Sequence, residues 1–287
     1  MRPEIRKAEG SPGPASGRPR PRWFRWLAKP SARLVSTSVL AAVAIIFATP
    51  ASGGMASRFA KAVGFGPSPS QNGAPFGGTP AVGALFTTSN GHLGTHFCTA
   101  SVVNSPHGNL LLTAAHCVVG TQGTIAFVPG YANGQAPYQI WYVSRIFTDQ
   151  AWNNSASVDD DVAFLEVSRN GGAPIEDVTG AEQLGIGLPP VELTRVIGYP
   201  NGAPEPVVCQ NWTKAFSPNQ LEFDCGGYPD GTSGGPFLIR VDHATGQGTV
   251  MGVIGGYQQG GDSPTVSYSA MFGSNVRALY ESAVARS

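Results

Sequence analysis

The sequence predicts an all-β protein. Only 13% of the 287 residues are charged, while glycine and proline are abundant, at 38 and 24 residues. Short strands need many turn residues, whereas long helices are usually richer in Glu, Lys and Arg. Short apolar and β-branched runs, separated by turn residues, support the same class. The hydrophobic fraction of 41% is enough to build the core of one large domain or two small ones.

The first 51 residues have the pattern of a secretory signal with a long basic start. Nine of the 18 basic residues lie between Arg2 and Arg33, and an apolar stretch over 34–48 follows them. Small residues at 48–51 resemble a cleavage site. As a helix, the apolar stretch would span ~22 Å, which is short of the ~30 Å hydrocarbon core of a membrane. We therefore expect a secreted protein with no membrane contact after signal cleavage, and an uncleaved N-terminal anchor is the alternative.

Residues 52–80 are low in charge and rich in Gly, Pro and Ser. This composition is typical of a linker or a short propeptide. We therefore expect the folded domain to begin at residue 81 and to continue to residue 287.

Six short strand-forming runs follow, and they fit one small antiparallel barrel over about 81–167. The predicted strands are 82–87, 97–104, 110–114, 124–128, 138–147 and 162–167. Residues 168–190 contain several Gly and Pro residues, and we expect them to cross to a second unit.

Six more runs predict a second six-stranded barrel over about 190–272. These strands are 191–197, 207–216, 220–224, 235–241, 249–255 and 265–272. The last segment, 275–284, has apolar residues at the spacing of an amphipathic helix. Ser274 or Asn275 could cap this C-terminal helix.

The charge distribution argues against a nucleic-acid partner. From residue 82 onward, seven basic residues stand against 16 acidic ones, which is a net charge of −9. A body of this sign would be repelled by nucleic acid and by an anionic membrane surface.

All four cysteines lie beyond the predicted signal. They form two natural pairs, Cys98 with Cys117 and Cys209 with Cys225, although four cysteines allow three connectivities. The sequence alone does not choose between them. No Cys-x-x-Cys spacing and no histidine pair accompanies the cysteines, so we expect no metal site.

Three segments place a histidine, an acid and a serine in that order along the chain. His116 lies in TAAHC, Asp161 begins DVAFL, and Ser233 lies in GTSGGP. A serine hydroxyl needs a base within hydrogen-bond reach to become a nucleophile, and a neutral imidazole suits that role. Asp159 and Asp160 precede Asp161, and strand periodicity alone does not decide which carboxylate would face the imidazole.

These segments, together with FCTAS at 97–101, resemble the chymotrypsin/trypsin family of serine peptidases over about 82–285. The same triad occurs in other orders on other folds, so the order itself discriminates. The resemblance implies two barrels with the active site between them, and no metal or organic cofactor. It also implies that a disulfide between Cys98 and Cys117 closes the loop that carries the histidine.

The resemblance assigns roles to individual residues. It implies Ser233 as the nucleophile, His116 as the general base and Asp161 as the acid that orients the imidazole. The family's acid stands directly before a β-branched residue followed by Ala, which selects Asp161 over its neighbours. The backbone N–H groups of Gly231 and Ser233 would form the oxyanion hole.

The resemblance also suggests residues for the primary specificity pocket. Six residues before Ser233 lies Gly227, where a trypsin has Asp, and we expect the far wall to come from Gly255, Gly256 and Tyr257. No counter-charge for Lys or Arg is therefore evident at the pocket floor. Asp230 or Asp262 could still reach the pocket, so a preference for basic residues is disfavoured and stays open.

Thr232 departs from the animal digestive members of the family, which have Asp at this position. There the carboxylate pairs with a new N-terminus that cleavage releases. A threonine has no charge for that ion pair, so we expect a site that forms without the switch, as in several bacterial relatives.

The resemblance thus predicts a secreted, monomeric serine endopeptidase that acts on peptide or protein substrates. Two alternatives use the same scaffold. One is a catalytically silent binding module, and the other is an esterase with the same triad.

Overall fold

The computed structural model describes residues 71–121, 123–168 and 172–287, all within the compact unit Ala60–Ser287. The predicted signal over 1–51 and the stretch 52–70 of the predicted linker lie outside the described residues. Among the helices of the described part, none is long and apolar enough to cross a membrane.

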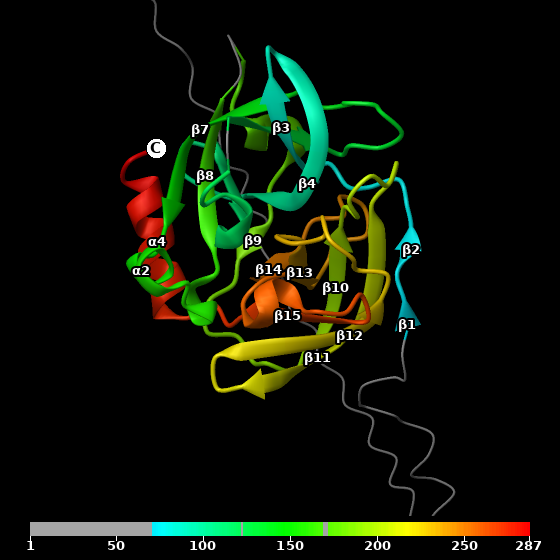
Figure 1. The fold of residues 1–287 in the computed structure, drawn as a ribbon, viewed down its shortest axis with the longest axis vertical. Coiled ribbons are helices and arrows are strands. Elements are labelled where there is room, and N and C mark those ends of the chain that lie inside the picture. The colour runs from blue at the N-terminus through cyan, green and yellow to red at the C-terminus, as the bar shows by residue number, and fades with distance from the viewer. Residues whose placement is uncertain (1–70, 122, 169–171) are drawn as a thin grey trace, which may run out of the picture. The chain divides into compact units, whose positions relative to one another are not determined.

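The first predicted barrel is present and closed. Six antiparallel strands follow one another in the order β3-β4-β5-β8-β7-β6 (Figure 1). Their bounds are β3 (Val82–Ser89), β4 (His92–Val103), β5 (Leu110–Thr113), β6 (Thr124–Pro129), β7 (Trp141–Thr148) and β8 (Ala163–Ser168). Side chains such as Phe127, Phe164 and Leu165 are fully buried inside it. Burial of each contributes roughly 1.5–3 kcal/mol of hydrophobic stabilisation.

The second predicted barrel is a nine-stranded sheet. It contains all six predicted strands, β10 (Leu193–Gly198), β11 (Val207–Ser217), β12 (Gln220–Gly226), β13 (Pro236–Ile239), β14 (Thr249–Val253) and β15 (Val266–Ala270). In the order in which these six strands pair, β15-β12-β11-β10-β13-β14, strands β14 and β15 lie at opposite ends. These two ends approach each other where the Gly255 N–H donates to the Tyr268 carbonyl at 3.0 Å. The sheet also has three two-residue strands that the sequence does not predict, among them β9 (Gln183–Leu184).

The ten residues before the predicted start at residue 81 are part of the fold. Strand β1 (Gln71–Asn72) pairs in parallel with β12, and β2 (Ala74–Pro75) pairs antiparallel with β11. Figure 1 shows both strands running beside the second sheet. The Gly- and Pro-rich composition that suggests a linker is compatible with such short strands, because a glycine permits close backbone approach.

The C-terminal helix α4 (Ser274–Val284) is present where the amphipathic pattern places it. Its buried residues Val276, Leu279 and Ala283 lie on the side that packs on β7 and β8. The expected cap is wrong, because Gly273 is the N-cap residue and no side chain caps the helix. The Asn275 amide instead donates to the loop before β8.

Two short helices, α2 (Gln150–Ser155) and α3 (Ile175–Thr179), lack a sequence signal because neither exceeds six residues. Helix α2 is capped by the Asp149 carboxylate, which accepts from the Ala151 N–H at 2.7 Å.

Candidate active site

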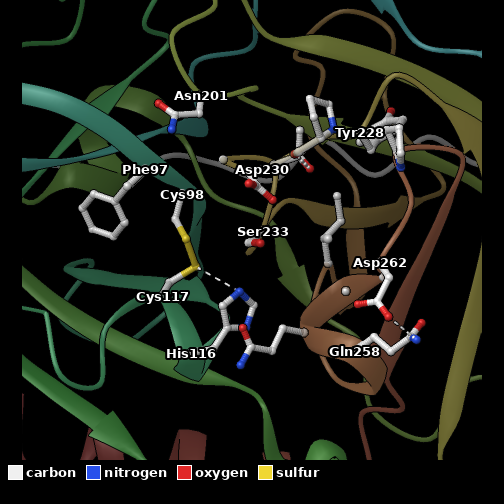
Figure 2. Close-up of a pocket in the computed structure, with 18 of the residues that line it drawn as sticks. Phe97, Cys98, His116, Cys117, Asn201, Tyr228, Asp230, Ser233, Gln258 and Asp262 are labelled. Carbon is white, nitrogen blue, oxygen red and sulfur yellow. Dashed lines mark hydrogen bonds between the residues drawn. A yellow bond between two sulfur atoms is a disulfide. The ribbon is translucent and has the colours of Figure 1, made fainter.

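A cleft of about 930 Å³ is lined by residues from the barrel and from the second sheet. The barrel contributes residues near the Cys98–Cys117 disulfide, including His116. The second sheet contributes two segments, 228–233 and 258–264, together with Asn201 and Ile254. Side chains from distant parts of the chain therefore share one solvent-accessible space (Figure 2).

His116 is held next to a buried carboxylate. It lies in a short 3₁₀ helix (Ala115–Cys117) directly after β5, and its side chain is 12% exposed. Its Nδ1 lies 2.7 Å from Oδ2 of Asp161, and its backbone N–H donates to Oδ1 at 2.9 Å. Oδ2 also accepts from the Gly256 N–H at 2.8 Å. These donors satisfy a carboxylate that is fully buried. With Nδ1 donating to Asp161, Nε2 is the nitrogen that is left to accept a proton.

The two neighbouring acids point elsewhere. Asp159 accepts from the amide of Gln220 at 2.7 Å and from that of Asn219 at 2.9 Å. Asp160 accepts from Ser157 at 2.7 Å and from Asn275 at 2.9 Å. Of the three consecutive acids, Asp161 is the one hydrogen-bonded to His116.

The loop that carries Ser233 is held by two hydrogen bonds from Thr99 of the barrel. The Thr99 N–H donates to the Ser233 carbonyl at 2.7 Å, and the Thr99 hydroxyl donates to the Gly231 carbonyl at 3.0 Å. Gly231 has a φ of +93°, and a Cβ there would lie 2.4 Å from the Asn201 nitrogen. The loop therefore needs glycine at 231 for both its conformation and its packing.

One contact sets the direction of the Gly231 N–H group. The Asp230 carbonyl accepts from the Asn201 N–H at 2.7 Å. In a trans peptide the C=O and the following N–H point in opposite directions, so the Gly231 N–H points away from Asn201. Within the described part of the chain, the N–H groups of Gly231 and Ser233 have no hydrogen-bond partner. Both are free to receive an acceptor.

Ser233 and His116 line the same cleft, and Figure 2 shows both among the side chains that surround it. Among the described residues, no hydrogen bond joins the Ser233 hydroxyl to Nε2 of His116, which lies 3.8 Å from Cys117 Sγ. Contacts of this kind are often long without substrate and tighten when it binds.

A protein-family model described as Trypsin matches residues 70–270. The chain belongs to the trypsin family. By family and fold it is a trypsin-like serine endopeptidase. The family match begins at residue 70, next to β1 and ahead of the domain start expected at residue 81.

Solved structures of bacterial and related proteases share the trypsin fold of this chain. Protease Anisep from Arthrobacter nicotinovorans has a TM-score of 0.63 at 23% identity, covering 74% of this chain and 99% of that one. A thermostable serine protease, AL20, from an extremophilic microorganism has a TM-score of 0.62 at 24% identity, covering 73% and 99%. A Glu endopeptidase has a TM-score of 0.58 at 15% identity, covering 76% and 99%. A comparison with curated protein sequences finds no significant match.

The predicted pocket residues of this trypsin-family chain lie beside the cleft, and their neighbours line it. Tyr228 lines the cleft in place of Gly227, which faces Gly73. Gly255 and Gly256 pack against the Asp161 carboxylate. Tyr257 is 38% exposed and packs on Phe216, with ring centroids 4.8 Å apart.

A kink after Tyr257 explains this shift. Gln258 and Gln259 both have left-handed backbones, with φ of 51° and 53°, and both line the cleft. After this turn, residues 258–264 form the wall of the cleft that was expected from residues 255–257. Asp262, whose carboxylate accepts from the Gln258 amide, lines the cleft, as does Asp230. Asp230 and Asp262, the two residues that the sequence left open for the pocket, therefore both line the cleft.

The side chains around His116 do not fit a metal ion. In the described residues, the candidate ligand group consists of Cys98, His116 and Cys117. Both cysteines are in one disulfide and offer no thiolate.

Several residues that shape the site carry no chemical signature in the sequence. Thr99 holds the Ser233 loop, and Asn201 directs the Asp230 carbonyl. Gln220 holds the loop over 158–161 that carries the three acids, which we call the acid loop. Tyr228 lines the cleft, and its hydroxyl donates to the Val196 carbonyl at 2.7 Å. Burial raises the pKa of Tyr228, so this hydroxyl keeps its proton. Of the four, Thr99 alone lies inside a motif, FCTAS, that could have indicated it.

Proposed function

We propose that this protein hydrolyses peptide bonds by acyl transfer, with Ser233, His116 and Asp161 as its catalytic triad. The observation that carries the proposal is the 2.7 Å contact between His116 and the buried Asp161, in a cleft that Ser233 also lines. Membership of the trypsin family supports the same roles.

In the first step, the Ser233 hydroxyl attacks the scissile carbonyl of the substrate. Nε2 of His116 takes the hydroxyl proton as the oxygen–carbon bond forms, and then returns it to the leaving amine. Asp161 keeps the Nδ1 proton in place and stabilises the imidazolium. In the second step, His116 activates water, which releases the acyl group from Ser233.

The negative oxygen of the intermediate needs donors that are already in position. The unpartnered N–H groups of Gly231 and Ser233 suit this role. Each such donor is worth roughly 3 kcal/mol in comparable enzymes. The hydrogen bond from the Asn201 N–H to the Asp230 carbonyl supports an oxyanion hole that is formed before the substrate binds.

We further propose that the protein acts outside the cell. The basic start and apolar stretch of the N-terminal residues support export. The two disulfides support it as well, because such bonds persist mainly in oxidising compartments.

A serine-directed phosphonate tests the nucleophile. We expect it to modify the purified protein at Ser233, detected by peptide mass spectrometry, and to leave a Ser233→Ala variant unmodified. An unlabelled wild-type protein would favour the silent binding module. Turnover of a peptide library then separates the remaining options, since labelling with ester turnover but no peptide turnover would favour the esterase.

A further inference from the structure

Residues 71–80, which we call the N-terminal strap, cross from the second sheet to the barrel. The Gly73 N–H donates to the Gly226 carbonyl at 2.7 Å, and the Phe76 N–H donates to the Pro206 carbonyl at 3.1 Å. At the barrel end, the Thr79 carbonyl accepts from the Val82 N–H at 3.3 Å. Backbone hydrogen bonds therefore hold the strap to the second sheet at Gly73 and Phe76, and Figure 1 shows β1 and β2 of the strap beside that sheet.

The first residues of the strap lie directly behind the wall of the cleft. Strand β1 pairs with Cys225 and Gly226, which immediately precede Gly227 and the cleft-lining Tyr228. A Cβ at Gly73 would lie 3.4 Å from the Tyr228 ring and 3.3 Å from the Gly226 carbonyl oxygen. The strap thus packs on Tyr228, a residue of the cleft wall.

A cut at the start of the predicted domain would create a positive charge on a residue that is fully buried in the intact chain. Ala81 is fully buried, and its carbonyl accepts from the Val102 N–H at 2.8 Å. Cleavage before Ala81 would turn its nitrogen into an ammonium group, and burying an unpaired charge is costly. Thr232, also buried, offers a hydroxyl that donates to the Pro229 carbonyl at 2.7 Å and no carboxylate.

We propose that the N-terminal strap is a permanent part of the active enzyme and positions the Tyr228 wall of the substrate pocket. Maturation therefore removes residues upstream of Gln71, and a cut at residue 81 inactivates the enzyme. This inference rests on the proposed function, because the pocket in question is the one beside Ser233.

The N-terminus of the secreted enzyme gives the first test. Phosphonate-labelled protein is isolated from the culture medium, so that only molecules with a competent Ser233 are examined, and its N-terminal residue is determined. We expect it to be Gln71 or a residue before it. A labelled species that begins at Ala81 would overturn the proposal.

Two glycine variants of the full chain give the second test. Gly73→Val places a side chain against Tyr228, whereas Gly77→Val is a matched control, because a Cβ at Gly77 meets nothing within 4 Å. For a peptide substrate, we expect Gly73→Val to raise KM about tenfold and Gly77→Val to leave it unchanged. Methanesulfonyl fluoride, too small to fill the pocket, should label Ser233 at the same rate in both variants.

The outcomes separate the two proposals. Loss of labelling in wild-type protein would refute the proposed function, and with it the proposed role of the strap. Normal labelling with equal KM values for Gly73→Val and Gly77→Val would refute only the proposal that the strap positions the Tyr228 wall. If Gly73→Val does not fold, Gly73→Ala replaces it, and an unchanged KM there, with normal labelling, rejects the strap as well.

Discussion

Gln220 connects the acid loop to the loop that forms the far side of the cleft. Its amide nitrogen donates to the Val158 carbonyl at 3.1 Å and to Asp159 at 2.7 Å, while its oxygen accepts from the Tyr257 N–H at 3.0 Å. The residue is 3% exposed. The N–H that contacts Asp161 belongs to Gly256, next to Tyr257, so one buried amide holds both the loop before Asp161 and the segment that donates to Asp161.

Replacement of this amide should affect turnover more than substrate binding. In Gln220→Leu, buried groups that lose their partners cost about 1–3 kcal/mol each. We expect kcat to fall about tenfold with little change in KM, and the free energy of unfolding to fall as well. Asn219→Ala is the control, since Asn219 also contacts Asp159 but is exposed. Equal kcat values for the two variants would contradict this role.

Thr232 offers a test of how the site is assembled. Its hydroxyl bond to Pro229 is a neutral one, and its removal in Thr232→Ala should cost about 1 kcal/mol. We expect kcat/KM to stay within about tenfold of the wild type. A drop to the level of Ser233→Ala would show that this position is as essential as the Asp of the animal enzymes.

The histidine loop depends on the disulfide between Cys98 and Cys117, whose sequence separation is 19 residues. Chain-entropy arguments give about 3 kcal/mol for a loop of this length. We expect the double variant Cys98→Ala/Cys117→Ala to lose about that much stability in denaturant unfolding, and to lose activity because Cys117 adjoins His116. The matched variant Cys209→Ala/Cys225→Ala, with a separation of 16 residues, should lose similar stability and less kcat.

The twelve longer strands could be predicted because apolar and β-branched residues mark them. Strands β1, β2 and β9 could not, since two residues carry no periodic signal. They form because partners distant in sequence offer free edges. The same limit applies to the site. Motifs select His116, Asp161 and Ser233 as the proposed triad, but the left-handed backbone at Gln258 and Gln259 moves the cleft wall beyond what counting along the chain predicts.

Two buried titratable groups lie where the barrel meets the second sheet. His96 of β4 contacts the Ala203 carbonyl at 3.2 Å, and burial lowers the pKa of His96. Glu182 bonds through its backbone to Val102 and Asn104, while its carboxyl accepts from the Gly248 N–H. Burial raises the pKa of Glu182 to about 8. Both groups are therefore neutral in the folded protein near pH 7.

Glu182 should make stability fall as pH rises. Its contribution to the free energy of unfolding is fully present below its ordinary pKa of 4.5 and is lost as pH rises towards about 8. The reason is that the Glu182 carboxyl ionises at lower pH in the unfolded chain than in the folded protein. By pH 7 the loss is roughly 3 kcal/mol. Urea unfolding of a Ser233→Ala background, which avoids self-digestion, should show this slope between pH 5 and 8. Adding Glu182→Gln should flatten it, and an unchanged slope would exclude Glu182 as the cause.

Neither disulfide crosses from one half of the protein to the other. Each joins cysteines fewer than 20 residues apart, one pair at the barrel and one within the second sheet. Any other pairing must close a far longer loop, which costs more entropy and forms more slowly. We therefore expect oxidative refolding to reach the native bridges early, separately in each half, so that covalent closure precedes the meeting of His116 with Ser233.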